Sequence, residues 1–357
     1  MTIRTLHVVR RFGLVGGMES YVWNLSHALV NREISVEILC QSVEGAADPR
    51  IIVHKVSPSR HRRRWLAMSD FRKKAQAFWF EFANKGSAVV HSHERTSFHH
   101  ITTFHGPPMP ILQELPWYKR MSPRVRAWCR WEEEEVSGPN VRMVAPVSKR
   151  IRRMLIDRHP NAEALIGEPF YPGLNNCQVG RFQPVAHELR IVFVGLEWKR
   201  KGLEKAINVA VSLRKYYPDL TLDIFGPAAE SVSFLRQYSW IQCYGWVPQP
   251  PFSRYHLLIH PAIEEPFGMV VMEALASGCR AIVSECVGAG ELTHRALRVF
   301  DLDKADAEWA LEAHNLISET HGADHLDTFP TWDELAKSYI AAYREILSSR
   351  NEDCIND

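Results

Sequence analysis

The sequence lacks the cysteine patterns that build disulfide frameworks or zinc ribbons. Its seven cysteines are scattered and odd in number, and no two of them form a C-x-x-C pair. Chains of this kind usually occur in reducing compartments. We therefore expect a cytoplasmic protein without structural disulfides.

Long apolar runs are missing too. No stretch of roughly 18 uncharged apolar residues occurs, although a membrane-spanning helix needs about 20. The first residues carry Arg4, Arg10 and Arg11 inside their apolar run and show no small-residue cleavage signature. We expect a chain that is neither exported nor membrane-spanning.

A strong overall charge is also absent, since the 357 residues carry a net charge of only +2. The two halves differ, however. Residues 1–175 hold 26 Lys and Arg against 16 Asp and Glu, whereas residues 176–357 hold 17 against 25. This asymmetry predicts that the first half approaches an anionic surface. No nucleic-acid recognition motif accompanies it, so we expect no nucleic-acid partner.

Short β-branched runs alternate with longer amphipathic stretches along the chain. This pattern is typical of βαβ units and parallel sheets. It stops at a segment rich in Pro, Gly and Asn, residues 168–188, and then starts again. With 46% hydrophobic residues, enough for two cores, the sequence predicts an α/β fold with two Rossmann-like domains, residues 1–175 and 176–331.

The dinucleotide fingerprint G-x-G-x-x-G does not follow the first expected strand. The segment "FGLVGGMES" instead places Gly16 and Gly17 directly before an expected helix at residues 18–31. Such glycines allow a sharp turn and leave backbone N–H groups open to an anion. A tight strand-to-helix turn without a ligand explains the pair equally well.

A second strand-to-loop junction, "VFVGLEWKRKG", carries three consecutive cations. Lys199, Arg200 and Lys201 follow Gly195 and precede another expected helix. Cations at such a crevice can hold a diphosphate, Arg200 through two parallel hydrogen bonds and Lys201 as a point charge. The alternative is a solvated loop.

Two carboxylates stand in the otherwise apolar segment "EEPFGMVVMEALASG". Glu265 lies in an expected loop and Glu273, eight positions later, about one turn inside a helix that ends at Gly278. The two acceptors therefore flank a helix N-terminus, which attracts phosphate. Alternatively, Glu265 only complements the helix dipole and Glu273 is a surface residue.

Taken in order, these segments resemble a known family. The "GGMES" turn, "AVVHSHE", "TTFHG", "APVSKRIRRML", the "VFVG" to "RKG" loop and the two glutamates are similar to retaining glycosyltransferases of family 4. The resemblance implies the GT-B fold, in which two Rossmann-like domains face a central cleft. It also implies that the C-terminal helix, residues 332–350, crosses back to the N-terminal domain.

Within the family, the chain looks closest to bacterial lipopolysaccharide-core glycosyltransferases. These also place "RKG" after a strand without the arginine that many relatives carry directly after the glycine. Leu196 occupies that place here. We therefore assign the second cation on the diphosphate to Arg200.

The resemblance also implies roles for individual residues. The catalytic group would be His105, Glu265, Arg200 and Lys201. Glu265 would accept from hydroxyls of the transferred sugar, and Glu273 would accept from the ribose. The residues implied in donor binding are Gly16, Gly17, Gly245, Val247, Phe267, Gly268, Met269, Val270 and Glu273.

The implied reaction is front-face transfer with retention, in which a phosphate oxygen of the leaving group takes the acceptor's proton. No protein nucleophile, metal or other cofactor is expected. The "DLD" segment at Asp301 and Asp303 matches the D-x-D of metal-dependent enzymes, but it lies past the crevice loops. We expect a UDP-sugar donor and a lipid-linked glycan acceptor.

Two segments mix basic residues with aromatic ones, residues 59–82 and 115–135. Trp117, Trp128 and Trp131 stand in the second segment beside Lys119, Arg120, Arg124, Arg126 and Arg130. This composition suits an anionic lipid surface, so we expect a cytoplasmic protein peripherally associated with the inner face of the plasma membrane. A core helix with a solvated basic face is the alternative.

Two further functions remain open from the sequence. His91, His93 and His105 lie close together in the sequence, which allows a zinc-dependent hydrolase. An inactive relative that only binds nucleotide sugars is the other alternative.

Overall fold

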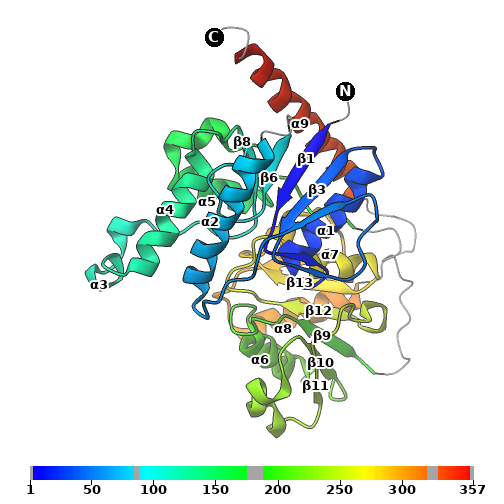
Figure 1. The fold of residues 1–357 in the computed structure, drawn as a ribbon. Coiled ribbons are helices and arrows are strands. Elements are labelled where there is room, and N and C mark those ends of the chain that lie inside the picture. The colour runs from blue at the N-terminus through cyan, green and yellow to red at the C-terminus, as the bar shows by residue number, and fades with distance from the viewer. Residues whose placement is uncertain (1–2, 84–87, 175–187, 320–328, 354–357) are drawn as a thin grey trace. The chain divides into compact units, whose positions relative to one another are not determined.

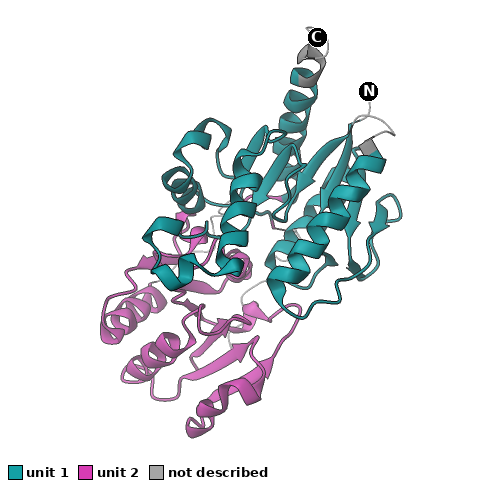
Figure 2. Ribbon diagram, turned by 60° about the vertical axis from the view of Figure 1, so that its left-hand side comes forward, with its two compact units in different colours: residues 1–173, 332–357 teal, residues 174–331 magenta. Residues whose placement is uncertain are grey.

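The computed structural model describes residues 3–83, 88–174, 188–319 and 329–353. The chain divides into two compact units (Figure 2): unit 1 comprises residues 1–173 and 332–357, and unit 2 comprises residues 174–331. The sequence places the boundary between residues 175 and 176. Most of the expected linker, residues 175–187, lies outside the described residues.

Unit 1 is built around a six-stranded parallel sheet with the order β5-β3-β1-β6-β7-β8 (Figure 1). Its strands are β1 (Arg4–Val8), β3 (Ser35–Cys40), β5 (Ile52–Lys55), β6 (Val89–Ser92), β7 (Ile101–Phe104) and β8 (Met143–Pro146). From β1 the chain builds the sheet outward through β3 and β5 and then returns to β6 on the other side. The direction of strand addition therefore reverses between β1 and β6, which opens a crevice at their carboxyl ends.

The helices of unit 1 are α1 (Gly17–Val30), α2 (Arg64–Ala83), α3 (Trp117–Arg120), α4 (Pro123–Ser137), α5 (Lys149–Arg158) and α9 (Trp332–Asp353). Short 3-10 helices occupy Leu112–Glu114 and Pro160–Leu165, and β2 (Arg11–Gly13) pairs with β4 (Ser42–Glu44) in a separate small sheet. Every residue of β6 and β7 is buried, as expected for central parallel strands covered on both faces.

The last helix, α9, belongs to unit 1 although it follows all of unit 2 in the chain. In Figure 1 it lies beside α1. The Tyr21 and Tyr339 hydroxyls share a hydrogen bond of 2.9 Å, and the Tyr343 hydroxyl lies 2.7 Å from Nδ1 of His91. At the exposed end, Arg32 pairs with Asp333. The return of the C-terminal helix to the first domain, expected from the sequence, is confirmed.

Unit 2 repeats the same plan with the strand order β11-β10-β9-β12-β13-β14. The strands are β9 (Arg190–Val194), β10 (Thr221–Phe225), β11 (Ile241–Gly245), β12 (Leu257–His260), β13 (Arg280–Ser284) and β14 (Leu297–Phe300). The helices are α6 (Leu203–Leu213), α7 (Met269–Ala276) and α8 (Asp306–Ser318), with 3-10 helices at Ala229–Gln237, Phe252–Arg254 and Gly288–Glu291. The order of strand addition reverses between β9 and β12.

Each unit has its own apolar core. In unit 2 the buried Trp309 and Phe193 belong to a cluster formed by the sheet, α6 and α8. In unit 1 the core includes Phe71 of α2 and Trp131 of α4. None of the helices in the described part of the chain combines the length and hydropathy that a membrane span requires. The predicted fold class, α/β with two Rossmann-like domains, is confirmed.

One expectation about the aromatic residues is wrong. Trp131 does not face a lipid surface, because it is 3% exposed and packs in the core of unit 1. Trp128 is half-buried against it, with ring centroids 5.2 Å apart. Only Trp117, 71% exposed on α3, has the exposure that the lipid-surface interpretation requires of all three.

Candidate functional site

A polar cluster of unit 2 lies at the carboxyl ends of β9 and β12, where the order of strand addition reverses. The loop after β9 carries Arg200 and Lys201, and the loop after β12 carries Glu265. Ligands of open α/β sheets bind at this position because the two loops diverge and leave a crevice. The structure thus brings together three of the four predicted catalytic residues.

Glu265 is at the centre of this cluster. Its carboxylate forms an ion pair with Lys201 and lies 3.5 Å from Nη1 of Arg200. Arg200 also pairs with Glu197 at 2.6 Å and donates to the backbone carbonyl of Glu264. Glu265 is buried. A buried carboxylate needs nearby positive charge, and Arg200 and Lys201 supply it.

The electrostatics of Lys201 follow from its burial. Desolvation, followed by the neighbouring positive charge of Arg200, lowers the pKa of Lys201 below its ordinary value. The contact with Glu265 acts in the opposite direction by stabilising the ammonium form. Lys201 is therefore a cation held in place by one carboxylate, and an incoming anion would compete for it.

Two glycines allow the loop to bring Lys201 to Glu265. Gly202 has φ of +77°, and a Cβ there would collide with the backbone carbonyl of Pro261. A Cβ on Gly195 would lie 2.7 Å from Cγ of Lys201, so the lysine side chain crosses a surface that only glycine leaves open. The "VFVGLEWKRKG" glycines therefore position the cations.

Helix α7 begins beside this cluster without a side-chain cap. Its N-cap is Gly268, with φ of +94°, and a Cβ there would lie 3.1 Å from Cγ of Glu265. Met269 and Val270 form the first turn, whose N–H groups have no partner within the helix. Phe267, the residue before Gly268, is buried. The helix start thus offers N–H groups and a positive dipole end within a few residues of Glu265.

Glu273 lies on α7, one turn inside the helix as predicted. Among the described residues its carboxylate has no hydrogen-bond or ion-pair partner, and burial raises its pKa to about 7. Its oxygens still reach the surface, since they are not among the fully buried unpaired atoms. An unpaired carboxyl group of this kind suits hydrogen bonds from hydroxyl groups of a ligand.

Gly245 ends β11 at the same carboxyl edge of the sheet, with φ of +70°, and no atom lies within 4 Å of a Cβ built on it. Val247 follows two residues later and is half-buried. Their position at this edge agrees with the predicted border of a nucleobase site, and that role stays a prediction.

In unit 1 the predicted glycine pair forms the start of α1. Gly16 is the N-cap in extended conformation, and Gly17 is the first helical residue, where an added Cβ would meet no atom within 4 Å. Glu19 already occupies the first turn and pairs with Arg11 at 2.7 Å. The turn is open on the side of Gly17, and its contact with a donor phosphate stays a prediction.

His105 directly follows β7 and belongs to a chain of histidines. Nε2 of His105 lies 3.1 Å from Nδ1 of His93, and Nε2 of His93 lies 3.2 Å from Nδ1 of His7. Burial lowers the pKa of His105 to about 3, so its imidazole is neutral at ordinary pH. A neutral His105 can donate or accept a hydrogen bond, but it supplies no positive charge.

The same histidines bear on the zinc alternative. His7, His91 and His93 offer ligand atoms within 4.8 Å of one another. However, His91 uses both ring nitrogens, toward Tyr343 and Thr103 at 2.7 Å each, and His93 uses both toward histidines. Only Nε2 of His7 is unpartnered among these nitrogens. The residues fit a hydrogen-bond network better than a metal site.

The "DLD" segment likewise has local partners. Oδ1 of Asp301 accepts a hydrogen bond of 2.9 Å from the backbone N–H of Asp303, and the Asp301 carbonyl accepts from the Trp309 indole. The segment follows β14, the strand farthest from β9 on that side of the sheet. Its side chains shape a turn.

One residue near the cluster escaped the sequence analysis. His260, the last residue of β12, is fully buried, and its Nε2 lies 3.9 Å from Glu265. Neither of its ring nitrogens has a hydrogen-bond partner among the described residues. Burial and the positive charge of Lys201 keep its pKa well below the ordinary value. The sequence signal for His260 is a polar residue at the end of an apolar strand, as in "LLIHPA".

The chain matches known families along most of its length. The model described as Glycosyltransferase Family 4 matches residues 15–166, and the one described as Glycosyl transferases group 1 matches residues 188–318. Among curated proteins, an uncharacterised 41.2 kDa protein of the cps region of Klebsiella pneumoniae is 26% identical over 204 residues, 55% of this chain. That match spans 51%, about half, of the relative's own length.

Solved structures share the fold across both units. WaaG, a glycosyltransferase involved in lipopolysaccharide biosynthesis, has a TM-score of 0.71 at 14% identity, with 94% of each chain covered. Anabaena HepE in complex with UDP-glucose has a TM-score of 0.63 at 15% identity, covering 98% of this chain and 100% of that one. The two family models together with this shared fold place the chain among the family 4 glycosyltransferases of the GT-B type.

Proposed function

We propose that the protein is a retaining, metal-independent glycosyltransferase that moves a sugar from a nucleotide-sugar donor to a hydroxyl group. The observation that carries this proposal is the cluster of Arg200, Lys201 and Glu265 beside the uncapped start of α7. It combines cations, a helix N-terminus and hydroxyl acceptors at one crevice. These are the groups that a sugar diphosphate requires.

In this proposal the cations act on the leaving group. A donor diphosphate next to Lys201 competes with Glu265 for the ammonium group. Arg200, held by Glu197 at 2.6 Å, presents its guanidinium to the same place. As the sugar–oxygen bond breaks, negative charge grows on the diphosphate, and these groups stabilise it together with the first N–H groups of α7.

The carboxylates serve recognition in this mechanism. Once Lys201 turns to the diphosphate, Glu265 accepts hydrogen bonds from hydroxyls of the transferred sugar, and Glu273 accepts from the ribose. His105, neutral because of its low pKa, contacts the donor sugar near the reacting carbon. The leaving phosphate oxygen takes the proton of the attacking hydroxyl, so no protein nucleophile takes part.

UDP-glucose is the donor we propose. The support is the structural likeness to Anabaena HepE, which has been solved in complex with UDP-glucose. For the acceptor we propose a lipid-linked glycan such as lipopolysaccharide core. The likeness to WaaG, described as involved in lipopolysaccharide biosynthesis, supports this choice.

The donor site is tested by titrating the protein with UDP and measuring turnover of UDP-glucose. We expect Lys201→Met to lower kcat by about a hundredfold, since one charge-stabilising donor contributes about 3 kcal/mol. Glu265→Gln should also lower turnover, because it removes the charged acceptor for the sugar hydroxyls and the partner of Lys201. Lys215→Met is the matched control, because Lys215 is exposed and has no partner among the described residues. Near-wild-type turnover in both site variants would refute the site.

We further propose that the protein binds the anionic inner surface of the plasma membrane through α3. Trp117, Tyr118 and Met121 are 71%, 59% and 66% exposed, and Lys119 and Arg120 stand between them. Such a segment buries its aromatic rings at the headgroup level while its cations meet lipid phosphates. In Figure 1, α3 lies at the outer end of unit 1.

Vesicle flotation tests this surface. Binding to anionic vesicles should fall with salt and should be lost in the double variant Trp117→Ser, Tyr118→Ser. Leu311→Ser, which removes an exposed apolar side chain of α8, should leave it unchanged. If the wild-type protein fails to float even at low salt, the membrane proposal is wrong.

The zinc-dependent hydrolase and the inactive relative are distinguished by two measurements. Stoichiometric zinc in purified protein, lost together with activity, would favour the hydrolase. UDP binding without any turnover of UDP-glucose, with a panel of acceptors present, would favour the inactive relative.

A further inference from the structure

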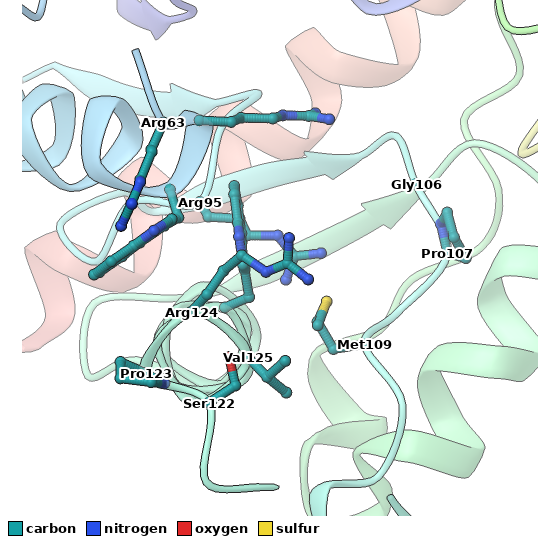
Figure 3. Close-up of a pocket in the computed structure, with 12 residues that line it drawn as sticks. Arg63, Arg95, Gly106, Pro107, Met109, Ser122, Pro123, Arg124 and Val125 are labelled. Atoms are coloured by element: carbon teal, nitrogen blue, oxygen red, sulfur yellow. The ribbon is translucent and has the colours of Figure 1, made fainter. Parts of the chain in front are cut away.

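A large pocket in unit 1 is not used by the mechanism above. Its volume is about 1010 Å³, which is at the upper end of the range for ligand pockets. The lining side chains come from the start of α2, the segment after β6, the segment after β7 and the start of α4 (Figure 3). It is therefore built by four segments that are far apart in the sequence.

The pocket is rich in arginine and has no acidic lining residue. Arg63, Arg64, Arg95 and Arg124 line it together with Trp65 and Trp128. Figure 3 shows Arg63, Arg95 and Arg124 on one side and the loop from Gly106 to Met109 on the other. Four guanidinium groups around one cavity repel each other, and an anion in the cavity removes this repulsion.

Among the described residues, only Arg95 of these four arginines has an ion-pair partner. Arg95 pairs with the buried Glu132 at 2.6 Å and lies over the Trp128 ring at 5.6 Å. The side chains of Arg63, Arg64 and Arg124 have no ion-pair or hydrogen-bond partner among the described residues. Three guanidinium groups without a partner among the described residues therefore line the cavity.

The start of α4 adds backbone donors to the same wall. Ser122 is its N-cap, but the serine side chain makes no capping hydrogen bond, and Pro123 has no N–H. The first intrahelical bond at this end runs from the N–H of Arg126 to the Ser122 carbonyl at 3.1 Å. The N–H groups of Arg124 and Val125 are thus available at the positive end of a 15-residue helix.

The opposite wall is held rigidly. The N–H of Met109 donates to Glu132 at 2.7 Å, and Arg158 donates to the Met109 carbonyl at 3.0 Å. This loop begins at Gly106, the residue after His105. The pocket therefore adjoins His105, the residue of unit 1 that we place near the reacting carbon.

We propose that this pocket binds a phosphate group carried by the acceptor, and that the acceptor sugar stacks on Trp65 or Trp128. This inference rests on the proposed glycosyltransferase function. A phosphate monoester carries nearly two negative charges and three acceptor oxygens, which matches several free arginines and a helix start better than a neutral sugar does. The two indole rings supply flat apolar faces beside these cations.

The test measures binding of glucose 6-phosphate, glucose and inorganic phosphate to the full chain by calorimetry, with the donor site filled by excess UDP. We expect glucose 6-phosphate to bind more tightly than either glucose or phosphate alone. Arg124→Met and Arg63→Met should each weaken its binding about tenfold, the loss expected from one charge-assisted hydrogen bond.

Arg153→Met is the matched control. Arg153 is an exposed arginine on α5 of the same unit, has no partner within the described part of the chain and does not line the pocket. Its loss should therefore leave the affinity unchanged. Equal weakening by Arg153→Met and Arg124→Met would overturn the proposal, because the effect would then be general charge. Equal affinity for glucose and glucose 6-phosphate would overturn it too.

A lipid headgroup is the other source of such a phosphate, and a second measurement separates it. Flotation with phosphatidylglycerol vesicles should be unaffected by Arg124→Met. Loss of flotation in that variant, with unchanged affinity for glucose 6-phosphate, would assign the pocket to the membrane and overturn the acceptor proposal.

Failure of the donor site can be recognised separately. If the wild-type protein does not bind UDP, the proposed function fails, whereas the comparison of Arg124→Met with Arg153→Met without UDP still tests the pocket. Lys201→Met should lower UDP affinity and leave glucose 6-phosphate affinity unchanged.

Discussion

At the residue scale, Glu273 is a carboxyl group whose burial lowers folding stability and which we infer is kept to bind a ligand. Its carboxyl group lies in a mostly buried position on α7 and has no partner among the described residues, so burial alone raises its pKa to about 7. Core packing would favour an apolar side chain here. We infer that a carboxylate is kept at this position for a ligand.

Replacing Glu273 by Gln should therefore stabilise the protein at high pH. Below about pH 4.5 the group is protonated in both folded and unfolded chains, so it has no effect. Between pH 4.5 and pH 7, Glu273 releases its proton in the unfolded chain but keeps it in the folded chain. The wild-type protein therefore loses folding stability as the pH rises through this range. At pH 8 we expect the variant to be more stable by as much as about 3 kcal/mol.

Urea unfolding at pH 4.5 and pH 8 measures this difference. A stability gain at pH 4.5 as large as that at pH 8 would contradict the mechanism. The donor should show the reverse trend: UDP-glucose affinity of the wild-type protein rises through pH 7 as the carboxylate forms, and the Gln variant should lack this rise.

At the element scale, the loop from Gly195 to Gly202 determines where the cations lie. The loop turns back on itself, with the Lys201 N–H bonded to the Glu197 carbonyl at 3.0 Å. Gly202 then starts α6 in the left-handed region. The position of Lys201 against Glu265 depends on this backbone conformation.

Gly202→Ala should disturb both stability and function. A Cβ at this φ of +77° collides with the Pro261 carbonyl, and the strained conformation costs about 1–3 kcal/mol. We expect that loss in urea unfolding, together with weaker UDP binding because Lys201 is displaced. Gly17→Ala is the comparison, since a Cβ there meets nothing within 4 Å. Equal destabilisation by both changes would contradict this account.

The alternating pattern predicted two parallel-sheet domains but did not delimit every strand. β5 and β14 lie at sheet edges and are partly exposed, so their residues do not form an apolar run. β8 has only four residues and ends in Pro146. Short strands without a clear alternating pattern are hard to delimit from sequence alone.

The candidate site was predictable where local motifs carry it. The loop cations, the glycine turns and Glu273 were all identified from short segments. The pairing of Lys201 with Glu265 joins residues 64 positions apart, and the bond from His91 to Tyr343 spans 252 positions. Such contacts depend on the arrangement of strands, which no local pattern contains. The arginine pocket was missed for the same reason.

At the scale of the whole molecule, buried neutral histidines link the fold to pH. Burial lowers the pKa of His7 and His105 to about 3 and that of His99 to about 4, and it holds His91 and His93 well below 6.5. Below pH 6.5 the unfolded chain binds protons that the folded chain does not. Folding stability should therefore fall as the pH is lowered.

We expect a loss of roughly 2 kcal/mol per such histidine between pH 7 and pH 5, measured by urea unfolding. His105→Gln should reduce the slope of folding stability against pH by the amount that corresponds to about one proton. A stability that does not change between pH 7 and pH 5 would show that these imidazoles take up protons in the folded state.

The return of α9 to unit 1 has a consequence for synthesis on the ribosome. Domains usually fold in the order in which they emerge. Tyr21 and Thr103 form hydrogen bonds with Tyr339, and His91 forms one with Tyr343. The first three residues are synthesised well before their two tyrosine partners. The first domain therefore cannot complete its buried hydrogen bonds until all of unit 2 has been translated. Nascent chains should expose this face for chaperones throughout that interval.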